Sequence, residues 1–156
     1  PEDLYLVASD AGYGFIAKLG DLASNKRAGK GVLKVPKGAG VVTPQRVTNF
    51  DNDWMAVVTT KGNILVLMVG ELPQMPRGKG DKIVNIPGAR VARREEYVAC
   101  IAVFREGQDL LLRTGKGELK LKHGEQIDRY VAERALRGAK LAKGYQEVQG
   151  IVTLET

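Results

Sequence analysis

The chain contains few of the residues from which metal sites, disulfides and catalytic clusters are built. Its 156 residues include one cysteine, Cys100, and one histidine, His123. A single cysteine excludes an internal disulfide framework and fits a reducing compartment such as the cytoplasm. One residue of each kind cannot assemble a zinc site from cysteine and histidine ligands. We therefore predict a cytoplasmic segment with no catalytic residue, no metal site and no cofactor of its own.

Long apolar runs and nucleotide-binding motifs are also missing. No apolar stretch approaches the roughly 20 residues of a membrane-spanning helix, and no basic start leads into a signal region. A phosphate-binding P-loop requires Ser or Thr after its lysine, whereas Lys30 and Lys79 are each followed by glycine. From the missing apolar runs we expect no membrane partner. The chain begins at Pro1 rather than methionine, so we also expect it to be part of a longer protein.

Acidic residues are scarce in three basic segments. Residues 23–40, 76–94 and 129–143 hold 16 of the 24 Lys and Arg but only 2 of the 18 Asp and Glu. Protein surfaces normally mix the two signs, so this separation indicates a nucleic acid or another polyanion as the partner. The alternative interpretation is that long loops collect lysines incidentally.

The sequence repeats at a spacing of about 50 residues. Gly12 matches Gly62, Asp21 matches Glu71, and the basic glycine loop at 25–31 (NKRAGKG) matches the loop at 75–81 (MPRGKGD). A looser third copy of the loop stands at 137–140. This period is typical of propeller-like arrays. We therefore treat the chain as one domain, 1–156, with repeats at about 3–50, 53–104 and 109–154.

The residue pattern in each repeat unit predicts about four short strands. Apolar and β-branched runs at 5–9 and 13–19, and again at 54–60 and 64–69, flank glycine-containing turns and indicate β-hairpins. Third strands are expected at 32–35 and 82–86, and fourth strands at 41–50 and 97–104. Residues 124–136 predict a short helix or an irregular loop. The predicted fold class is all-β: a propeller-like disc of about three four-stranded blades, incomplete as a disc.

The basic loops have the chemistry of a phosphate-binding surface. Glycines at 29, 31, 78 and 80 would let backbone N–H groups approach phosphate oxygens, and neighbouring Lys and Arg would supply charge without reading bases. Of the nine aromatic residues, only Tyr130 lies in a basic segment, which favours duplex DNA over single strands. The candidate DNA-binding residues are Lys26, Arg27, Lys30, Lys34, Arg77, Lys79, Lys82, Arg93, Arg94, Arg137 and Lys140.

Three segments carry a family resemblance. Residues 9–15 (SDAGYGF), 25–30 (NKRAGK) and 79–87 (KGDKIVNIP) resemble the carboxy-terminal β-pinwheel in the A subunit of bacterial type IIA topoisomerases, in the topoisomerase IV branch found in proteobacteria. The resemblance covers essentially the whole chain. It implies a non-catalytic module that binds and bends duplex DNA without sequence specificity and guides the transported segment.

The resemblance also implies partners and chemistry outside this segment. The parent enzyme would be a heterotetramer that combines an ATPase subunit with the topoisomerase core of the same polypeptide. It would use ATP and Mg²⁺ for decatenation and supercoil relaxation during chromosome segregation. The fuller glycine box of gyrase, Gln-Arg-Arg-Gly-Gly-Lys-Gly, is not reproduced, which favours guiding over tight wrapping. The alternatives are a gyrase-type DNA-wrapping domain and a propeller-like module that binds an acidic protein.

Overall fold

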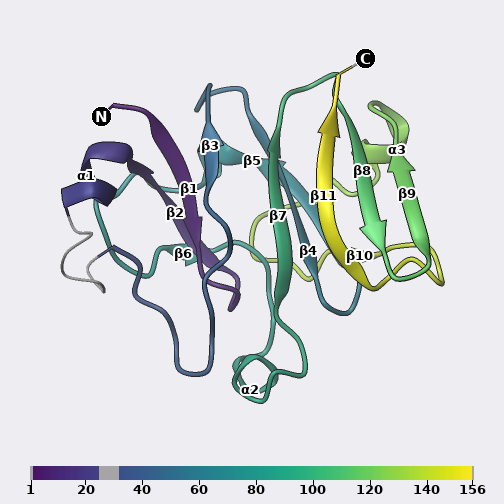
Figure 1. Cartoon of the computed structure of the whole chain (residues 1–156), viewed down its shortest axis with the longest axis horizontal. Coiled ribbons are helices and arrows are strands. Elements are labelled where there is room, and N and C mark those ends of the chain that lie inside the picture. The colour runs from purple at the N-terminus through teal and green to yellow at the C-terminus, as the bar shows by residue number, and fades with distance from the viewer. Residues whose placement is uncertain (1, 25–31, 156) are drawn as a thin grey trace.

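The chain forms three antiparallel sheets that stand side by side (Figure 1). The computed structural model describes residues 2–24 and 32–155. Within them the strand orders are β3-β1-β2-β6 in sheet 1, β10-β5-β4-β7 in sheet 2 and β11-β8-β9 in sheet 3. The regular elements of the described residues are therefore mostly strands, as the apolar and β-branched runs of the sequence predict.

Each sheet is built around one hairpin. Sheet 1 contains β1 (Leu4–Ala8), β2 (Tyr13–Lys18), β3 (Gln45–Val47) and β6 (Asp81–Lys82). Sheet 2 contains β4 (Trp54–Thr59), β5 (Asn63–Met68), β7 (Val98–Phe104) and β10 (Ala139–Lys140). Sheet 3 contains β8 (Asp109–Thr114), β9 (Gly117–Leu121) and β11 (Val148–Leu154). The helical elements are short: α1 (Leu19–Ser24), the 3-10 turn η2 (Val69–Glu71), α2 (Gly88–Ala92) and α3 (Glu125–Asp128). None of these described helices is long and apolar enough to cross a membrane.

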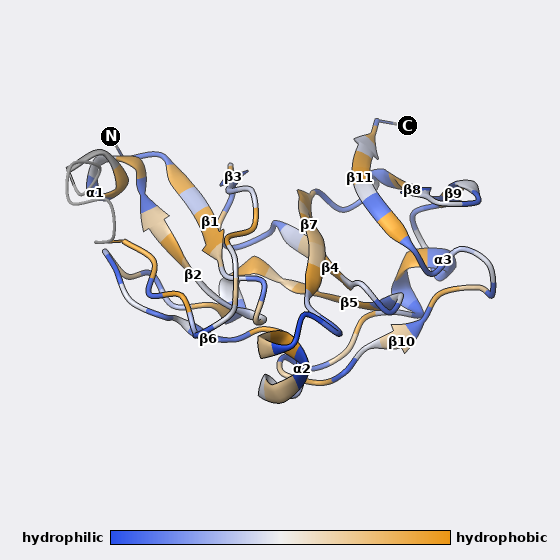
Figure 2. Ribbon diagram, turned by 60° about the horizontal axis from the view of Figure 1, so that its bottom comes forward, coloured by the Kyte–Doolittle hydropathy of each residue, from blue (hydrophilic) through white to orange (hydrophobic). Residues whose placement is uncertain are grey.

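The core lies between the faces of neighbouring sheets. In β4, Met55 and Val57 pack toward sheet 1, whereas Ala56 and Val58 pack toward sheet 3. Successive side chains of a strand point to opposite faces, so a strand buried on both faces must be apolar at every position. This explains the continuous apolar runs of the second hairpin. Figure 2 shows the same hydrophobic colouring along β4 and β5.

The outer strand of a sheet comes from the next sequence unit. β6 pairs with β2, with Tyr13 opposite Lys82, although the two residues are 69 positions apart in the sequence. β10 pairs with β5 in the same way, with Asn63 opposite Lys140. Each unit therefore supplies the outer strand of the preceding sheet. Among the described residues, β9 has no such outer strand.

Some predicted elements differ in the structure. The expected third strands at 32–35 and 82–86 are wrong in extent, because only a single bridge at Leu33 and the two residues of β6 pair in those regions. Ile83 and Val84 are fully buried, so these residues are apolar because they fill the core and not because they extend a sheet. The segment 124–136 contains both predicted alternatives, since the four-residue α3 continues into an irregular path.

Candidate nucleic-acid interface

The second basic loop protrudes from the outer edge of sheet 1. The amide of Ile16 in β2 donates to the carbonyl of Pro73 (2.9 Å), and the amide of Met75 donates back to Ile16 (2.9 Å). The chain then leaves the edge and returns as β6, where Asp81 lies opposite Gly14. Residues 76–80, with Arg77 and Lys79, therefore form a short excursion from the sheet edge.

The third basic loop protrudes from sheet 2 at the equivalent place. Val66 in β5 donates to the carbonyl of Tyr130 (3.0 Å) and accepts from the amide of Ala132 (3.2 Å). The chain returns as β10 beside Asn63 and Ile64. Lys140 therefore occupies the position on sheet 2 that Lys82 occupies on sheet 1. Two consecutive sheets thus present basic residues at matching points on their outer edges.

One glycine in each loop is required by the return to the sheet edge. Gly80 has φ +84°, and a Cβ there would lie 2.1 Å from the carbonyl oxygen of Gly14. Gly138 has φ +77°, and its Cβ would lie 2.6 Å from the carbonyl oxygen of Ile64. Only glycine fits such a close approach at a positive φ. These two glycines therefore serve the fold first, and the basic residues beside them form the surface.

Hydrogen bonds connect successive basic segments. The amide of Lys34 donates to the carbonyl of Gly78 (2.8 Å), and the amide of Gly78 donates to Val32 (2.8 Å). Further along, Ala135 donates to Ile83 (2.7 Å) and Asn85 to Leu136 (2.9 Å). The described parts of the three basic segments therefore form one continuous row. The amide of Gly78, expected from the sequence to face phosphate, is directed at Val32 instead.

A tyrosine lies beneath two of the lysines. The Nζ of Lys79 is 4.0 Å from the ring centroid of Tyr13, and the Nζ of Lys82 is 5.8 Å from it. Lys82 also donates to the side-chain oxygen of Asn85 (3.2 Å). An aromatic face attracts a nearby ammonium group and fixes its position. Tyr130, the one aromatic in a basic segment of the sequence, is buried in the core, so counting aromatics along the sequence missed the ring that meets the lysines.

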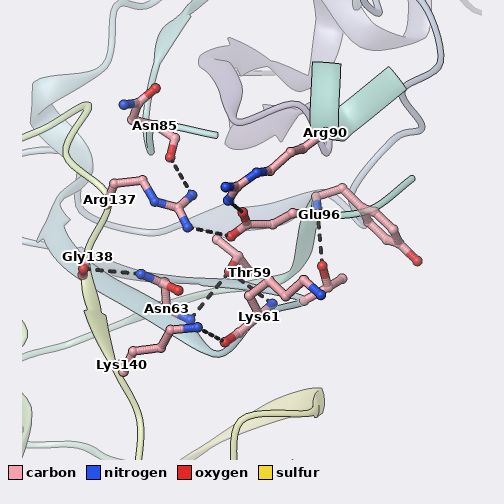
Figure 3. A network of polar contacts seen from close by, with 11 residues as sticks. Thr59, Lys61, Asn63, Asn85, Arg90, Glu96, Arg137, Gly138 and Lys140 are labelled. Atoms are coloured by element: carbon pink, nitrogen blue, oxygen red, sulfur yellow. Dashed lines mark hydrogen bonds and ion pairs between the residues drawn. The ribbon is translucent and has the colours of Figure 1, made fainter. Parts of the chain in front are cut away.

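A buried carboxylate organises the row where sheet 2 meets α2 (Figure 3). The side chain of Glu96 is 0% exposed and accepts from Arg137 Nη2 (3.0 Å) and Arg90 Nη1 (3.2 Å). Arg137 also donates through Nη1 to the carbonyl of Asn85 (2.8 Å). Both arginine side chains are partly exposed, at 34% for Arg137 and 50% for Arg90. Glu96 therefore holds two arginines in place at the surface.

The environment of Glu96 favours its ionised form. Burial alone would raise the pKa of the Glu96 carboxyl, but hydrogen bonds from Arg137, Thr59 and Arg90 outweigh burial and lower it below its ordinary value of 4.5. The pKa of Asp109 is also lowered, chiefly by hydrogen bonds from the backbone and ring of His123. A carboxyl whose pKa is lower in the folded state binds its proton more tightly in the unfolded chain. Both carboxylates therefore stabilise the fold fully at pH values above their ordinary pKa, and this stabilisation is lost as the pH falls.

We expect the free energy of unfolding to fall as the pH drops below 4.5 and through the lower pKa of folded Glu96. The measurement is urea denaturation over a series of acidic pH values. In Glu96→Gln the part of this decline that comes from Glu96 is lost, while the part from Asp109 remains. Identical pH dependence in the parent and in Glu96→Gln would contradict this account of Glu96.

The remaining candidate residues fall into three groups. Arg94 lies within an internal network: it bonds both carboxylate oxygens of Asp10 (2.8 and 3.0 Å), donates to the carbonyl of Gly38 and covers the ring of Tyr97 at 3.7 Å. The side chains of Lys34, Arg77 and Arg93 are exposed. Figure 2 shows hydrophilic colouring on the loop after α2, which contains Arg93. The candidates Lys26, Arg27 and Lys30 lie outside the described residues.

The one cysteine is largely buried, and the one histidine is hydrogen-bonded to a carboxylate. Burial raises the pKa of the Cys100 thiol to about 12, so the thiol is protonated at neutral pH. The ring of His123 contacts Asp109 through Nδ1 at 2.8 Å. Within residues 2–24 and 32–155, no group of three or more His, Cys, Asp or Glu is placed to hold a metal ion.

Comparison with known proteins places this geometry in a family. Residues 3–48 and 53–92, more than half of the chain, match the family described as DNA gyrase C-terminal domain, beta-propeller. The A subunit of DNA topoisomerase 4 from Pseudomonas aeruginosa is 47% identical over 154 residues, which is 97% of this chain and 20% of the relative. Its counterpart from Escherichia coli K12 is 37% identical over 94% of this chain and 19% of the relative. The chain thus spans about a fifth of the length of these relatives.

Solved structures agree on the fold. The Escherichia coli ParC C-terminal domain superposes with a TM-score of 0.85 and 31% identity, over 99% of this chain and 62% of that structure. The DNA gyrase A C-terminal domain superposes with a TM-score of 0.71 at 13% identity, over 98% of this chain and 49% of that one, and so shares the fold. These findings confirm the β-pinwheel predicted from the sequence. The chain belongs to the family of the DNA gyrase C-terminal domain, and its β-pinwheel is of the kind found at the C-terminus of the A subunit of topoisomerase IV.

Proposed function

We propose that the row of basic loops binds duplex DNA through its phosphates, without sequence specificity. The observation that carries the proposal is the repetition of basic residues at matching points on two consecutive sheet edges. Lys79 and Lys82 lie at the edge of sheet 1, and Arg137 and Lys140 at the edge of sheet 2. A regular row of cations suits a regular row of phosphates, which carries no base information.

The fixed geometry of the cations supports this function. Lys79 is positioned by the ring of Tyr13, and Arg137 by Glu96 and the carbonyl of Asn85. Side chains that are already ordered lose less conformational entropy when they bind a partner. The exposed side chain of Arg77 belongs to the same loop as Lys79, and exposed Lys34 lies on the segment whose amide bonds Gly78, so both add positive charge to the row. Arg93 is exposed at the end of α2.

The arrangement of the sheets implies bending. The sheets are arranged like blades, so their outer edges follow a curve and a duplex in contact with two or more edges has to bend. The energy cost of bending is offset by the additional phosphate contacts that the bend permits. The loops provide a short row of contacts, which suits guiding a duplex better than wrapping it tightly.

In the longer protein that the relatives suggest, this domain would guide the transported duplex for a type IIA topoisomerase. Their shared name, which makes each of them the A subunit of DNA topoisomerase 4, supports that role. We infer that a strand-breaking core in the same polypeptide, a separate ATPase subunit, ATP and Mg²⁺ belong to other parts of such an enzyme. We also infer that the protein acts in the bacterial cytoplasm, on decatenation and supercoil relaxation.

The test is a titration of mixed-sequence duplex DNA at rising salt. Each neutralised phosphate releases counterions and contributes about −0.9 to the slope of log K against log salt. We expect a slope of roughly −4 or steeper, because the four edge cations alone would contribute about −3.6, and equal affinity for unrelated sequences. Binding that is stronger to an acidic polypeptide such as polyglutamate than to the duplex would instead support a protein-interaction module.

A further inference from the structure

The row of basic residues at the outer sheet edges (Lys79, Lys82, Arg137 and Lys140), here called the outer-edge row, continues into a hollow beside α2. The hollow has a volume of about 420 Å³ and is lined by Lys61, Arg90, Glu95, Arg137 and Lys140. Its cations come from three separate places: the turn between β4 and β5, helix α2, and the segment that leads into and includes β10. We propose that this hollow is a phosphate-binding subsite, at which Lys61 and Arg90 contact the DNA together with Arg137 and Lys140.

The charge in the hollow is unbalanced. Four cations face two carboxylates, Glu95 at the surface and Glu96 beneath it, so positive charge is in excess. Glu96 is fully buried and acts as a positioning residue, because it is engaged by the two arginines and cannot itself reach a ligand. An anion in the hollow would therefore meet arginine and lysine donors rather than the Glu96 carboxylate.

Two cations of the hollow, Lys140 and Arg137, are anchored on backbone carbonyls. Lys140 Nζ donates to the carbonyl of Lys61 (2.7 Å), which brings the two lysines together from residues 79 positions apart (Figure 3). Asn63 donates to the carbonyl of Gly138 (3.4 Å) and ties the same turn to the segment before β10. An ammonium group has three donors, so Lys140 keeps donors for a phosphate after bonding Lys61. The hollow is thus held together before any ligand arrives.

The ligand is a phosphodiester group of the bound duplex. Arg137 and Lys140 belong both to the hollow and to the outer-edge row, so a duplex lying on the row necessarily passes the hollow. The volume is enough for a hydrated phosphate group, given that one water occupies about 30 Å³ in the liquid. Free polyphosphate presents the same oxygen chemistry, so the experiment has to separate the two sources. This inference rests on the proposed function.

The test compares Lys61→Ala/Lys140→Ala with the control Lys18→Ala/Arg46→Ala. Both variants lose two positive charges, but Lys18 and Arg46 lie outside the row and pair with Glu2 and Asp3. In the duplex titration, we expect the first variant to lower the magnitude of the salt slope by about 1.8 and the affinity roughly fiftyfold at 0.1 M salt. We expect the control to change affinity less than about threefold, since it removes no phosphate contact. Thermal denaturation of both variants checks that the fold is intact.

A second titration uses sodium tripolyphosphate as the probe. If Lys61→Ala/Lys140→Ala loses tripolyphosphate binding but keeps the parent's salt slope for duplex DNA, the hollow binds free anions and the proposal is overturned. The proposal is also overturned if the magnitude of the slope falls by only about 0.9, which is the contribution expected of Lys140 as an edge cation alone, and the proposed function then stands. Failure of the parent itself to bind duplex DNA would reject the proposed function as well.

Discussion

Reversing the charges of Arg77 and Lys79 is expected to weaken duplex binding more than any other double substitution in the described row. Both side chains extend from the excursion at residues 76–80, which precedes β6, and Lys79 lies on the ring of Tyr13. Loss of two phosphate contacts lowers the magnitude of the salt slope by about 1.8 and the affinity roughly a hundredfold at 0.1 M salt, with repulsion by the new carboxylates included. The measurement is a duplex titration of Arg77→Glu/Lys79→Glu over a range of salt concentrations.

The control for this prediction is Lys18→Glu/Arg46→Glu. It changes the net charge by the same amount, at two exposed residues paired with Glu2 and Asp3. We expect the control to keep the parent's salt slope, because long-range repulsion between exposed charges is screened beyond about 10 Å at 0.1 M salt. Equal losses of affinity in the two variants would mean that net charge, rather than the basic row, determines binding.

Among single Gly-to-Ala substitutions at the described glycines, Gly80→Ala is expected to lower the free energy of unfolding most. The new Cβ would lie 2.1 Å from the carbonyl oxygen of Gly14 at φ +84°, and neither backbone segment can move without breaking the pairing of β6 with β2. A positive φ alone costs about 1–2 kcal/mol for an L-residue, and the backbone clash brings the expected loss to about 4 kcal/mol. Urea denaturation of Gly80→Ala measures the change in the free energy of unfolding.

Gly88→Ala is the matched control. No atom lies within 4 Å of the position that its Cβ would occupy, and Gly88 is the first residue of α2. Since alanine is the better helix former, we expect no loss of stability and a gain of at most about 1 kcal/mol. If Gly80→Ala were as stable as Gly88→Ala, the close approach of β6 to β2 would not be a requirement of the fold.

The hairpins could be predicted from the sequence because their signals are local. Gly12 and Gly62 stand in the turns of the first two hairpins with φ +94° and +80°, and the flanking residues pair in register. The exchange of outer strands could not be predicted, because it joins Lys82 to Tyr13 and leaves no local pattern. The apolar residues after Lys82 are typical of a strand, although Ile83 and Val84 fill the core without extending one.

The candidate interface was only partly predictable for a related reason. Charge separation along the sequence indicates the basic segments, and two of these place Lys79 and Arg137 at the sheet edges. Lys61 lies outside every basic segment and joins the row only because β5 pairs with β10. Arg94 is a basic residue in a basic segment, as expected of an interface residue, but its guanidinium bonds Asp10. Which cations face outward depends on tertiary contacts that composition does not contain.

If consecutive sheet edges contact one duplex, the bound duplex must bend, and its bending can be measured. A short mixed-sequence duplex with a fluorophore at each end reports its end-to-end distance by energy transfer with and without the protein. We expect saturating protein to shorten that distance, and Arg77→Glu/Lys79→Glu to leave a straighter duplex even at concentrations where it is bound. A bound duplex as long as free DNA would show that consecutive edges do not contact one duplex, because contact with two curved edges requires a bend.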